Sequence, residues 1–328
     1  MIIDFEHHIY LPEQCVPKKS QSGKITERHW EDKDKLRIRI FNDASNIERF
    51  IQFMDDAGID MAVLTTNNFS GGLAQMKRWN TFCAEILKKY PERFRGFACI
   101  APMEGQAALD EIDRAVNDLG MIGVHIWTRN NGRHLDDRDM WPFYEKCAKF
   151  KLPVDVHVTI EPDGLDVMKS RYGLSYVLAR EFDMAVATLR VCLGGILEDF
   201  PELKFIMNHF GGGVSSVVDR LEAYMEFLGS GWEKFYLDEP LISKPWKHYW
   251  DKLYFNVAGR ETGTNSLKCA LTNIKPEKLV FGTDWPFNYD YRPEKVRQFV
   301  EEIRNLDLPA GAAEGILGDN AARILGLK

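Results

Sequence analysis

The sequence has no long apolar segment, no excess of positive charge and no leader-like start. No uncharged apolar stretch reaches the roughly 18 residues that a membrane-spanning helix needs, so we expect none. The net charge of −7 provides no broad cationic surface, which argues against nucleic acid or an anionic membrane as partner. Asp4 and Glu6 lie in the first ten residues, where a signal peptide would be basic and then apolar. We therefore expect a cytoplasmic protein.

Paired cysteines are also absent. The six cysteines are dispersed over 328 residues, and no Cys-x-x-Cys motif occurs. This spacing is typical of reduced interior thiols and not of a disulfide framework. A chain of this length can bury roughly 75% of its unfolded surface, so a large apolar core must hold the fold together.

Short apolar runs alternate with longer amphipathic segments, which favours a parallel sheet wrapped by helices. Eight runs are predicted strands: 2–5, 61–65, 97–100, 121–126, 154–158, 204–207, 253–257 and 279–282. Seven segments have helical spacing: 46–57, 73–89, 107–119, 141–151, 176–199, 214–227 and 293–305. Eight strands suit a closed barrel. We predict an α/β protein with a (β/α)8 barrel and one domain over residues 1–328.

Two segments exceed what a barrel needs. Residues 9–45 form a polar insertion after the first strand, and residues 228–251 carry six aromatic side chains before the seventh. The first insertion lies on a strand-to-helix connection, so it is a candidate lid or subunit contact. The aromatic residues of the second either reach the rim or pack outside the barrel. Simple decoration of the barrel is the alternative for both.

Four predicted strands deliver residues of metal-ligand type at their carboxyl ends. Glu6 and His8 follow the first strand and share a face, because strand side chains alternate with period two. His157 ends the fifth strand, His209 follows the sixth and Asp284 follows the eighth. In a barrel these ends converge on one rim. We predict one divalent ion bound by Glu6, His8, His157 and Asp284, with His209 in the ligand set or just outside it.

Each of these residues also has a structural interpretation. A single histidine at a strand end is more often a hydrogen-bonded rim residue, and Asp284 could cap a following helix. Five such residues at strand ends are hard to assign to chance. The metal site is therefore the preferred hypothesis.

The motifs resemble those of the amidohydrolase superfamily. They are Glu6-x-His8, His157 in Val-Asp-Val-His-Val, His209 in Asn-His-Phe-Gly-Gly and Asp284 in Gly-Thr-Asp-Trp-Pro. More narrowly, the chain resembles the metal-dependent decarboxylase branch, which includes aminocarboxymuconate semialdehyde, γ-resorcylate and 5-carboxyvanillate decarboxylases. The resemblance extends to residues 318–325, which form a frequent closing helix in that branch.

The first motif bears on the identity of the metal. Most amidohydrolases begin with His-x-His, whereas position 6 here is glutamate, as in the phenolic-acid decarboxylases. A carboxylate makes the ligand set harder and favours Mn²⁺, with Zn²⁺ as the alternative. The fourth strand ends in Val124-His125-Ile126-Trp127 without a lysine, so a carbamylated lysine bridging two ions is not expected.

The resemblance implies a decarboxylase of a small aromatic or muconate-like unsaturated carboxylate, with no flavin or pyridoxal cofactor. The metal would chelate the substrate, Asp284 would protonate the carbon that bears the carboxylate, and His209 would orient or recharge Asp284. The resemblance also implies that Arg220, and Arg37 or Arg39 in the first insertion, bind substrate carboxylate. In some members the first of these arginines acts across a subunit interface, so we expect a homo-oligomer, a dimer or a tetramer.

Plainer roles remain open for several of these residues. Arg220 could pair with Asp219 or Glu222 on a solvated helix. Trp285 and Phe287 follow Asp284 and could wall a flat substrate, but core packing is the alternative.

Two other functions stay open. The scaffold could belong to a hydrolase or hydratase in which the metal activates water and Asp284 acts as base. It could also be an inactive barrel that serves as a binding protein. Glu6 in place of histidine weighs against the first alternative, and the intact ligand set weighs against the second.

Overall fold

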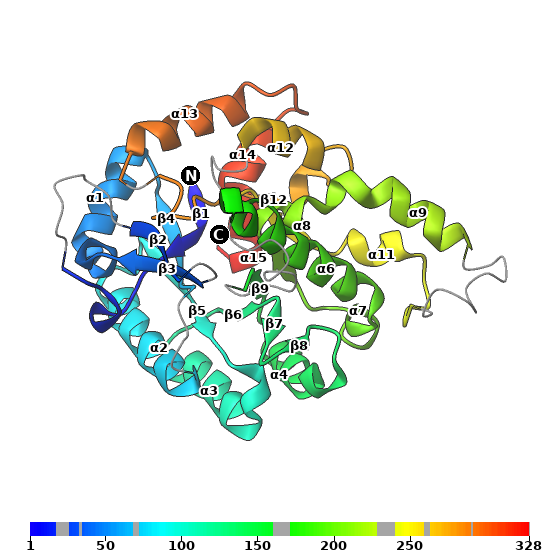
Figure 1. Cartoon of the computed structure of the whole chain (residues 1–328), viewed down its shortest axis with the longest axis horizontal. Helices are drawn as coiled ribbons and strands as arrows, with labels where there is room; N and C mark the ends of the chain where they lie inside the picture. Colours follow the sequence, from blue (N-terminus) through cyan, green and yellow to red (C-terminus); the bar gives the residue numbers. More distant parts are fainter. Residues whose placement is uncertain are drawn as a thin grey trace.

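Eight parallel strands form the centre of the molecule, and helices surround them (Figure 1). The computed structural model describes residues 1–17, 26–32, 35–67, 72–159, 171–227, 240–258, 263–289 and 291–327; for 26–32, 35–38, 171 and 227 it describes the backbone alone. The strands are β1 (Ile3–His8), β4 (Met61–Thr65), β5 (Phe94–Cys99), β6 (Gly123–Trp127), β9 (Val154–His157), β10 (Phe205–Met207), β11 (Tyr254–Asn256) and β12 (Leu279–Val280).

The sheet closes on itself. Each strand pairs with the next one in the order just given. The backbone N–H of Phe5 donates to the carbonyl of Phe281 (2.8 Å), and the N–H of Asp284 donates to the carbonyl of Glu6 (3.0 Å), which joins the last strand to the first. Every predicted strand corresponds to one of the eight. The predicted (β/α)8 barrel is therefore confirmed.

Helices on the outside connect the strands. They are α1 (Ile47–Ala57), α2 (Gly72–Lys89), α3 (Gln106–Asn117), α4 (Trp141–Phe150), α6 (Arg180–Leu193), α7 (Ile196–Asp199), α9 (Val218–Phe227), α11 (Trp246–Trp250), α12 (Gly263–Ala270), α13 (Pro293–Arg304), α14 (Ala312–Glu314) and α15 (Asn320–Leu325). π-Helical turns η6 (Ser175–Ala179) and η10 (Gly315–Asp319) lead into α6 and α15. The segment predicted as one helix over 176–199 divides at Gly195, where φ is 83°. Helix α12 was not predicted.

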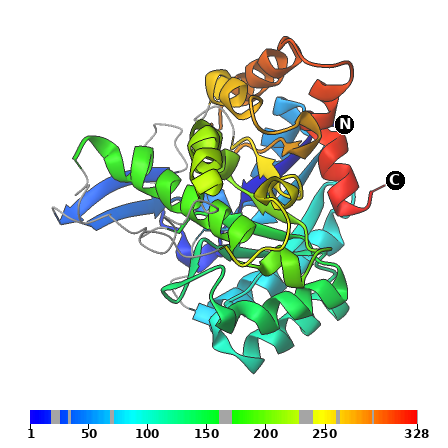
Figure 2. The same cartoon turned by 90° about the vertical axis from the view of Figure 1, so that its right-hand side faces the viewer.

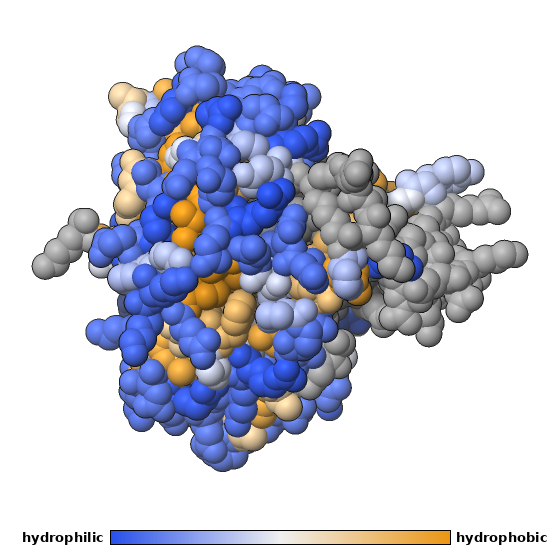
Figure 3. All heavy atoms as spheres, turned by 90° about the vertical axis from the view of Figure 1, so that its left-hand side faces the viewer, coloured by the Kyte–Doolittle hydropathy of each residue, from blue (hydrophilic) through white to orange (hydrophobic). Residues whose placement is uncertain are grey.

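Helix α1 illustrates how these helices form and pack. Its N-cap Asn46 accepts a hydrogen bond from the backbone N–H of Arg49 (3.1 Å), and it ends at Gly58 in the left-handed conformation with φ of 78°. Phe50 and Phe53 lie on its buried face, against the barrel. On the side of the molecule that carries α1 and α2, hydrophilic side chains cover most of the surface, and hydrophobic ones show mainly along a narrow band (Figure 3).

The interior of the barrel has an apolar floor. Side chains from five strands and from the closing helix α15 form a buried cluster: Ile3, Phe5, Met61, Val63, Phe97, Ile206, Val280, Ala321 and Ile324. A second, larger cluster fills the layer between the strands and the outer helices. The floor fills one end of the barrel, so polar side chains in the interior are confined to the carboxyl ends of the strands.

The first insertion forms an antiparallel hairpin, β2 (Thr26–Asp32) and β3 (Lys35–Ile40). The hairpin and the start of the η6–α6 helix project on the side of the molecule opposite to both chain termini (Figure 2). That is the side of the strand carboxyl ends. Its role as a lid or subunit contact stays a prediction.

In the second insertion, residues 228–239 lie outside the described part of the chain. The remaining aromatic residues, Trp246, Tyr249 and Trp250, are buried in α11, and Trp250 packs on Phe255 with ring centroids 5.1 Å apart. These three pack outside the barrel. Among the described residues, none of the helices combines the length and the apolar character that crossing a membrane requires.

Candidate metal centre

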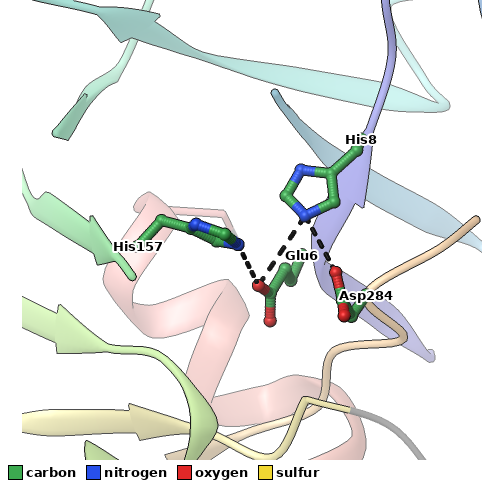
Figure 4. A group of neighbouring side chains, drawn as sticks. All are labelled: Glu6, His8, His157 and Asp284. Carbon is green, nitrogen blue, oxygen red and sulfur yellow. Dashed lines mark hydrogen bonds and ion pairs between the residues drawn. The ribbon is translucent and has the colours of Figure 1, made fainter. Parts of the chain in front are cut away.

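Four side chains converge above the apolar floor (Figure 4). Glu6 and His8 come from β1, His157 ends β9, and Asp284 follows β12. One ligand atom from each lies within 4.8 Å of the others, and all four residues are buried. The structure thus brings together the four residues that the sequence predicts as ligands of one divalent ion.

The contacts between these side chains fit a bound cation. The Nδ1–H of His157 donates to the carbonyl of Val158 (2.9 Å), so the Nε2 of the neutral ring carries a lone pair. That Nε2 lies 3.3 Å from Oε1 of Glu6, and Nε2 of His8 lies 3.8 Å from the same oxygen. A lone pair facing a carboxylate is repulsive unless a proton or a cation lies between them. Oε2 of Glu6 is also buried without a hydrogen-bond partner among the described residues.

The protonation states of the ligands suit a metal as well. Burial lowers the pKa of His8 to about 3 and that of His157 to about 4, so both imidazoles are neutral at pH 7. Burial by itself would raise the pKa of Glu6, but the neighbouring imidazoles of His157 and His209 hold that pKa well below its ordinary value. A carboxylate with two neutral imidazoles is the state in which these groups can bind an ion.

An irregularity in β1 aims Glu6 and His8 at the centre. The register between β1 and β4 shifts between Asp4 and His7. Phe5 belongs to the apolar floor inside the barrel, and its neighbour Glu6 also points inside, because the extra residue reverses the alternation. Asp4 and His7 consequently share the outer face, where Nδ1 of His7 lies 2.5 Å from Oδ2 of Asp4.

Neighbouring polar groups fix the ligands. The side-chain amide of Asn208 donates to Oε1 of Glu6 (3.0 Å), and Oγ1 of Thr65 lies 3.0 Å from Nδ1 of His8. Such contacts hold a ligand in one orientation and keep the second nitrogen of the histidine engaged. These contacts therefore hold the side chains of Glu6 and His8 in place.

Asp284 sits in an unusual backbone conformation, with φ of 49°. Its Oδ1 lies 2.9 Å from Nε2 of His8, so its carboxyl group faces the other ligands. Burial and the negative charge of Glu6 raise the pKa of Asp284 to about 7. This carboxyl group can therefore carry a proton near neutral pH, which an ordinary aspartate cannot.

His209 lies beside the four ligands and outside their cluster. Its Nδ1 is 2.7 Å from Oε1 of Glu181 on α6, and its Nε2 is 3.7 Å from Oε1 of Glu6, without a hydrogen-bond partner among the described residues. Burial alone would lower the pKa of His209, but the two carboxylates outweigh it and hold the pKa well above its ordinary value. Sequence reasoning did not find Glu181.

The glycines after His209 allow this contact. Residues 209–213 form a left-handed turn, α8, in which every φ is positive. A Cβ on Gly212 would collide with the backbone carbonyl of Glu181 and with Ala185. The glycine run therefore allows the turn to pack closely against α6. The glycine run indicates in the sequence that another element packs closely here, but it does not identify Glu181 as the residue in contact.

A cavity of about 350 Å³ opens beside the centre. Its lining includes Asp284 and His209 from the centre, Arg180 and Glu181 from α6, and Tyr176 from η6. A one-ring substrate fits a space of this size. Arg180 was not among the residues predicted from the sequence.

The predicted substrate-binding residues are more scattered. Phe287 is half-buried, and its ring meets that of His8 edge-on at 5.8 Å. Trp285 is fully buried on the outer side of β1, stacked on His7 at 5.2 Å, and is absent from the cavity lining. Core packing, the alternative for Trp285, is what the structure shows.

Two of the predicted arginines, Arg220 and Arg39, are absent from the cavity lining. Arg220 on α9 is exposed and contacts Tyr224, with 3.4 Å between Nη2 and the hydroxyl oxygen. Arg39 on β3 is exposed, and the side chain of Arg37 lies outside the described part of the structure. Neither Arg220 nor Arg39 is brought to the four predicted ligands in this chain.

The comparisons with known proteins agree with the fold. A family model described as Amidohydrolase matches residues 3–327. The chain belongs to this family. Its member γ-resorcylate decarboxylase of Polaromonas sp. strain JS666 is 26% identical over 310 residues, 88% of this chain and 89% of the relative. 2-Amino-3-carboxymuconate-6-semialdehyde decarboxylase of Dictyostelium discoideum is 26% identical over 251 residues, 76% of this chain and 65% of the relative.

Other relatives and solved structures of this type extend the picture. A hydratase of 2-keto-4-carboxy-3-hexenedioate from a Sphingobium strain is 31% identical over 144 residues, 41% of this chain and 40% of the relative. The crystal structure of 5-carboxyvanillate decarboxylase from Sphingomonas paucimobilis has a TM-score of 0.79 at 20% identity, covering 100% of this chain and 99% of that one. A dihydroxybenzoic acid decarboxylase from Polaromonas sp. JS666, solved with manganese and the inhibitor 2-nitroresorcinol, has a TM-score of 0.78 at 22% identity, covering 99% and 96%. The relatives that match most of the chain are carboxy-lyases, which supports a place in the decarboxylase branch of the amidohydrolases.

Proposed function

We propose that the protein is a metal-dependent, non-oxidative decarboxylase of a hydroxylated aromatic or muconate-like carboxylic acid. The observation that carries the proposal is the buried group of Glu6, His8, His157 and Asp284, which borders a one-ring cavity that His209 also lines. All four would hold the ion, and Asp284, which lines the cavity together with His209, would take its proton from His209 once substrate is bound.

A divalent ion held by these four residues would supply a Lewis acid that polarises the oxygens of a bound hydroxy acid. Two carboxylates and two imidazoles make a ligand set that suits Mn²⁺, with Zn²⁺ as the alternative. The manganese in the related Polaromonas enzyme supports the same choice. One ion is proposed, because the four ligand atoms form a single compact group.

Asp284 would act as general acid. In its protonated form it gives the proton to the ring carbon that bears the carboxylate, and that carbon becomes tetrahedral. The bond between this carbon and the carboxylate then breaks, its electron pair returns to the ring, and CO₂ leaves. Asp284 is left as the carboxylate and must be protonated again before the next turnover.

The position of His209 supports a role in returning that proton. Glu181 fixes its Nδ1, and its Nε2 is directed towards the centre. The carboxylate of Glu181 favours the protonated ring, so His209 holds a proton at the border of the cavity. We propose that His209 orients and recharges Asp284.

The reaction is tested by incubating the manganese-loaded and the metal-free protein with a series of 2-hydroxybenzoates and measuring CO₂ release. The metal-loaded protein should release CO₂ from at least one member and, with bicarbonate, carboxylate the product phenol. Stoichiometric metal with no CO₂ release from any hydroxylated aromatic or muconate-like acid would refute the decarboxylase.

A hydratase on the same scaffold is the second candidate, because a hydratase is among the relatives. In that case Asp284 would act as base towards water. Incubation in H₂¹⁸O with unsaturated keto acids separates the two. A hydratase adds one molecule of water to the substrate, seen as a gain in product mass, and releases no CO₂, whereas a decarboxylase releases CO₂ and adds no water.

We also propose that the chain assembles into a dimer or tetramer, in which Arg220 meets substrate in a neighbouring copy. Its exposure in the single chain, and the exposed apolar side chains of Tyr172 (87%) and Phe182 (63%), are compatible with such an interface. Light scattering on the purified protein gives the assembly size. A monomer at working concentration would exclude this role for Arg220.

A further inference from the structure

Arg180 is a cation in the cavity wall that none of the described residues neutralises. It begins α6 and lines the cavity together with Asp284 and His209. In the described part of the chain it makes no hydrogen bond or ion pair, and its Nε is buried without a partner. Its guanidinium lies over the ring of Tyr176, with 5.9 Å between the guanidinium carbon and the ring centroid. A partly buried guanidinium with no partner is costly, so it is expected where a ligand supplies one.

The carboxylates that line the cavity are already engaged. Oε1 of Glu181 lies 2.7 Å from Nδ1 of His209, and Oδ1 of Asp284 lies 2.9 Å from Nε2 of His8. Arg180 is nevertheless near the centre. Burial and Glu6 raise the pKa of Asp284, while the charge of Arg180 is close enough to act in the opposite direction. A negatively charged group in the cavity would therefore meet Arg180 without displacing an internal ion pair.

We propose that Arg180 is a specificity-determining residue that binds a second anionic group of the substrate, distal to the carboxylate that is lost. This rests on the proposed function, in which the leaving carboxylate and its neighbouring oxygen bind the ion that Glu6, His8, His157 and Asp284 would hold. The guanidinium offers a planar pair of N–H donors, which matches a carboxylate. The preferred substrates are then dicarboxylated phenols or dianionic muconate-like acids, in preference to hydroxybenzoates with one carboxylate.

Two unreactive ligands test this assignment by binding alone. In 2-nitrophenol a nitro group replaces the leaving carboxylate, and 4-hydroxy-3-nitrobenzoate carries the same pair of groups plus a distal carboxylate. Calorimetric titration of the manganese-loaded protein should show the benzoate binding about 10- to 100-fold more tightly, the range expected for a charge-assisted contact. Arg180→Met should remove most of this difference and leave 2-nitrophenol binding within about twofold of the unsubstituted protein.

The matched control is Arg190→Met, on the same helix. Arg190 pairs with Asp136 away from the cavity, and its removal changes the net charge equally. It should leave both affinities unchanged, which excludes a long-range charge effect. Arg180→Lys keeps the charge without the planar fork and should retain part of the difference, so it replaces Arg180→Met if that variant does not fold.

Each outcome decides the proposal. Equal affinities for the two ligands in the unsubstituted protein, or equal losses for both in Arg180→Met, would overturn the role of Arg180 while leaving the chelating site in place. Failure of both ligands to bind the metal-loaded protein would instead refute the proposed function, and this inference with it. Turnover of 4-hydroxyisophthalate against 2-hydroxybenzoate should show the same preference in kcat/KM.

Discussion

Two histidine–carboxylate pairs on β1 use similar side chains for different purposes. On the outer face, the carboxylate of Asp4 accepts from Nδ1 of His7 (2.5 Å) and from both the backbone N–H (2.8 Å) and the hydroxyl (2.6 Å) of Thr283. On the inner face, Glu6 has one oxygen without a partner in the described structure, and its other oxygen faces imidazole nitrogens. A buried carboxylate whose oxygens all accept hydrogen bonds stabilises the fold. A buried carboxylate with an oxygen that lacks a partner instead indicates a binding site.

The two pairs are adjacent in sequence, so neither burial nor residue type distinguishes them. All four residues are buried. The difference comes from what each face meets. The outer face contacts the turn after β12, which supplies hydrogen-bond donors, and the aromatic side chains of α1, which exclude water. The inner face contacts the ligand atoms of His157 and Asp284. Substitutions on the two faces should therefore fail in different ways.

The largest effect is expected on the inner face at Asp284. Asp284→Asn removes the proposed proton donor and should lower kcat by about 10²- to 10⁴-fold, the range of general acid catalysis. The amide oxygen can still reach the ion, so some metal should stay bound. CO₂ release and metal content of the purified variant check this. Activity within tenfold of the unsubstituted enzyme would remove Asp284 as the donor.

The second test exchanges one carboxylate for its amide on each face of β1. Asp4→Asn removes the charge that accepts from His7 and Thr283, and should lower the free energy of unfolding of the metal-free protein by about 2–3 kcal/mol. Glu6→Gln should change that free energy by less than about 1 kcal/mol, because it also relieves a buried charge, but should weaken metal binding at least about tenfold. Urea unfolding and competition with a chelator give the two quantities. Equal losses of stability in the two variants would abolish the distinction between the faces.

How much of this could be predicted from the sequence depended on which information is local. Period two placed Glu6 and His8 on one face correctly, because the alternation of side chains is regular from Glu6 to His8. The same rule cannot predict the register shift in β1, and so it cannot tell that Phe5 and Glu6 both point inwards. The eight strands were predictable for a related reason. Each is a short apolar run between amphipathic segments, and this pattern can be recognised from the local sequence alone.

Residues whose position depends on tertiary packing were not predictable. Trp285 follows a ligand in sequence, but the backbone turns at Asp284 (φ 49°) and sends the indole to the outer face. Arg180 and Glu181 lie in a helix that was predicted, but a helical pattern does not say which turn reaches the cavity. Arg220 was assigned by resemblance alone, and in the single chain its helix directs it to solvent.

A third histidine–carboxylate pair, His209 with Glu181, joins two elements and can be disturbed through the backbone. Gly212 and Gly213 have nearly equal φ values, 71° and 69°, but a Cβ would collide with α6 only at Gly212. Gly213→Ala should cost about 1 kcal/mol of stability from backbone strain alone. Gly212→Ala should cost about 1–2 kcal/mol more and reduce turnover, because it displaces Glu181 from His209. Thermal unfolding and kcat of the two variants measure these effects, and their difference reports the contact of Glu181 with His209. Equal stability and equal kcat in the two variants would show that Gly212 is needed only for the turn.

The smallest expected effect concerns the inner face alone, and it is the number of protons released when the metal binds. With pKa values of about 3 and 4, His8 and His157 are neutral above pH 5, whereas Asp284, with a pKa of about 7, is largely protonated at pH 6 and largely ionised at pH 8. Because a metal ligand must be deprotonated, Mn²⁺ binding should release close to one proton at pH 6 and few at pH 8. Titration calorimetry in buffers of different ionisation enthalpy counts these protons. Asp284→Asn should abolish the pH-dependent release, and release that persists in this variant would assign the proton to another group, such as His209.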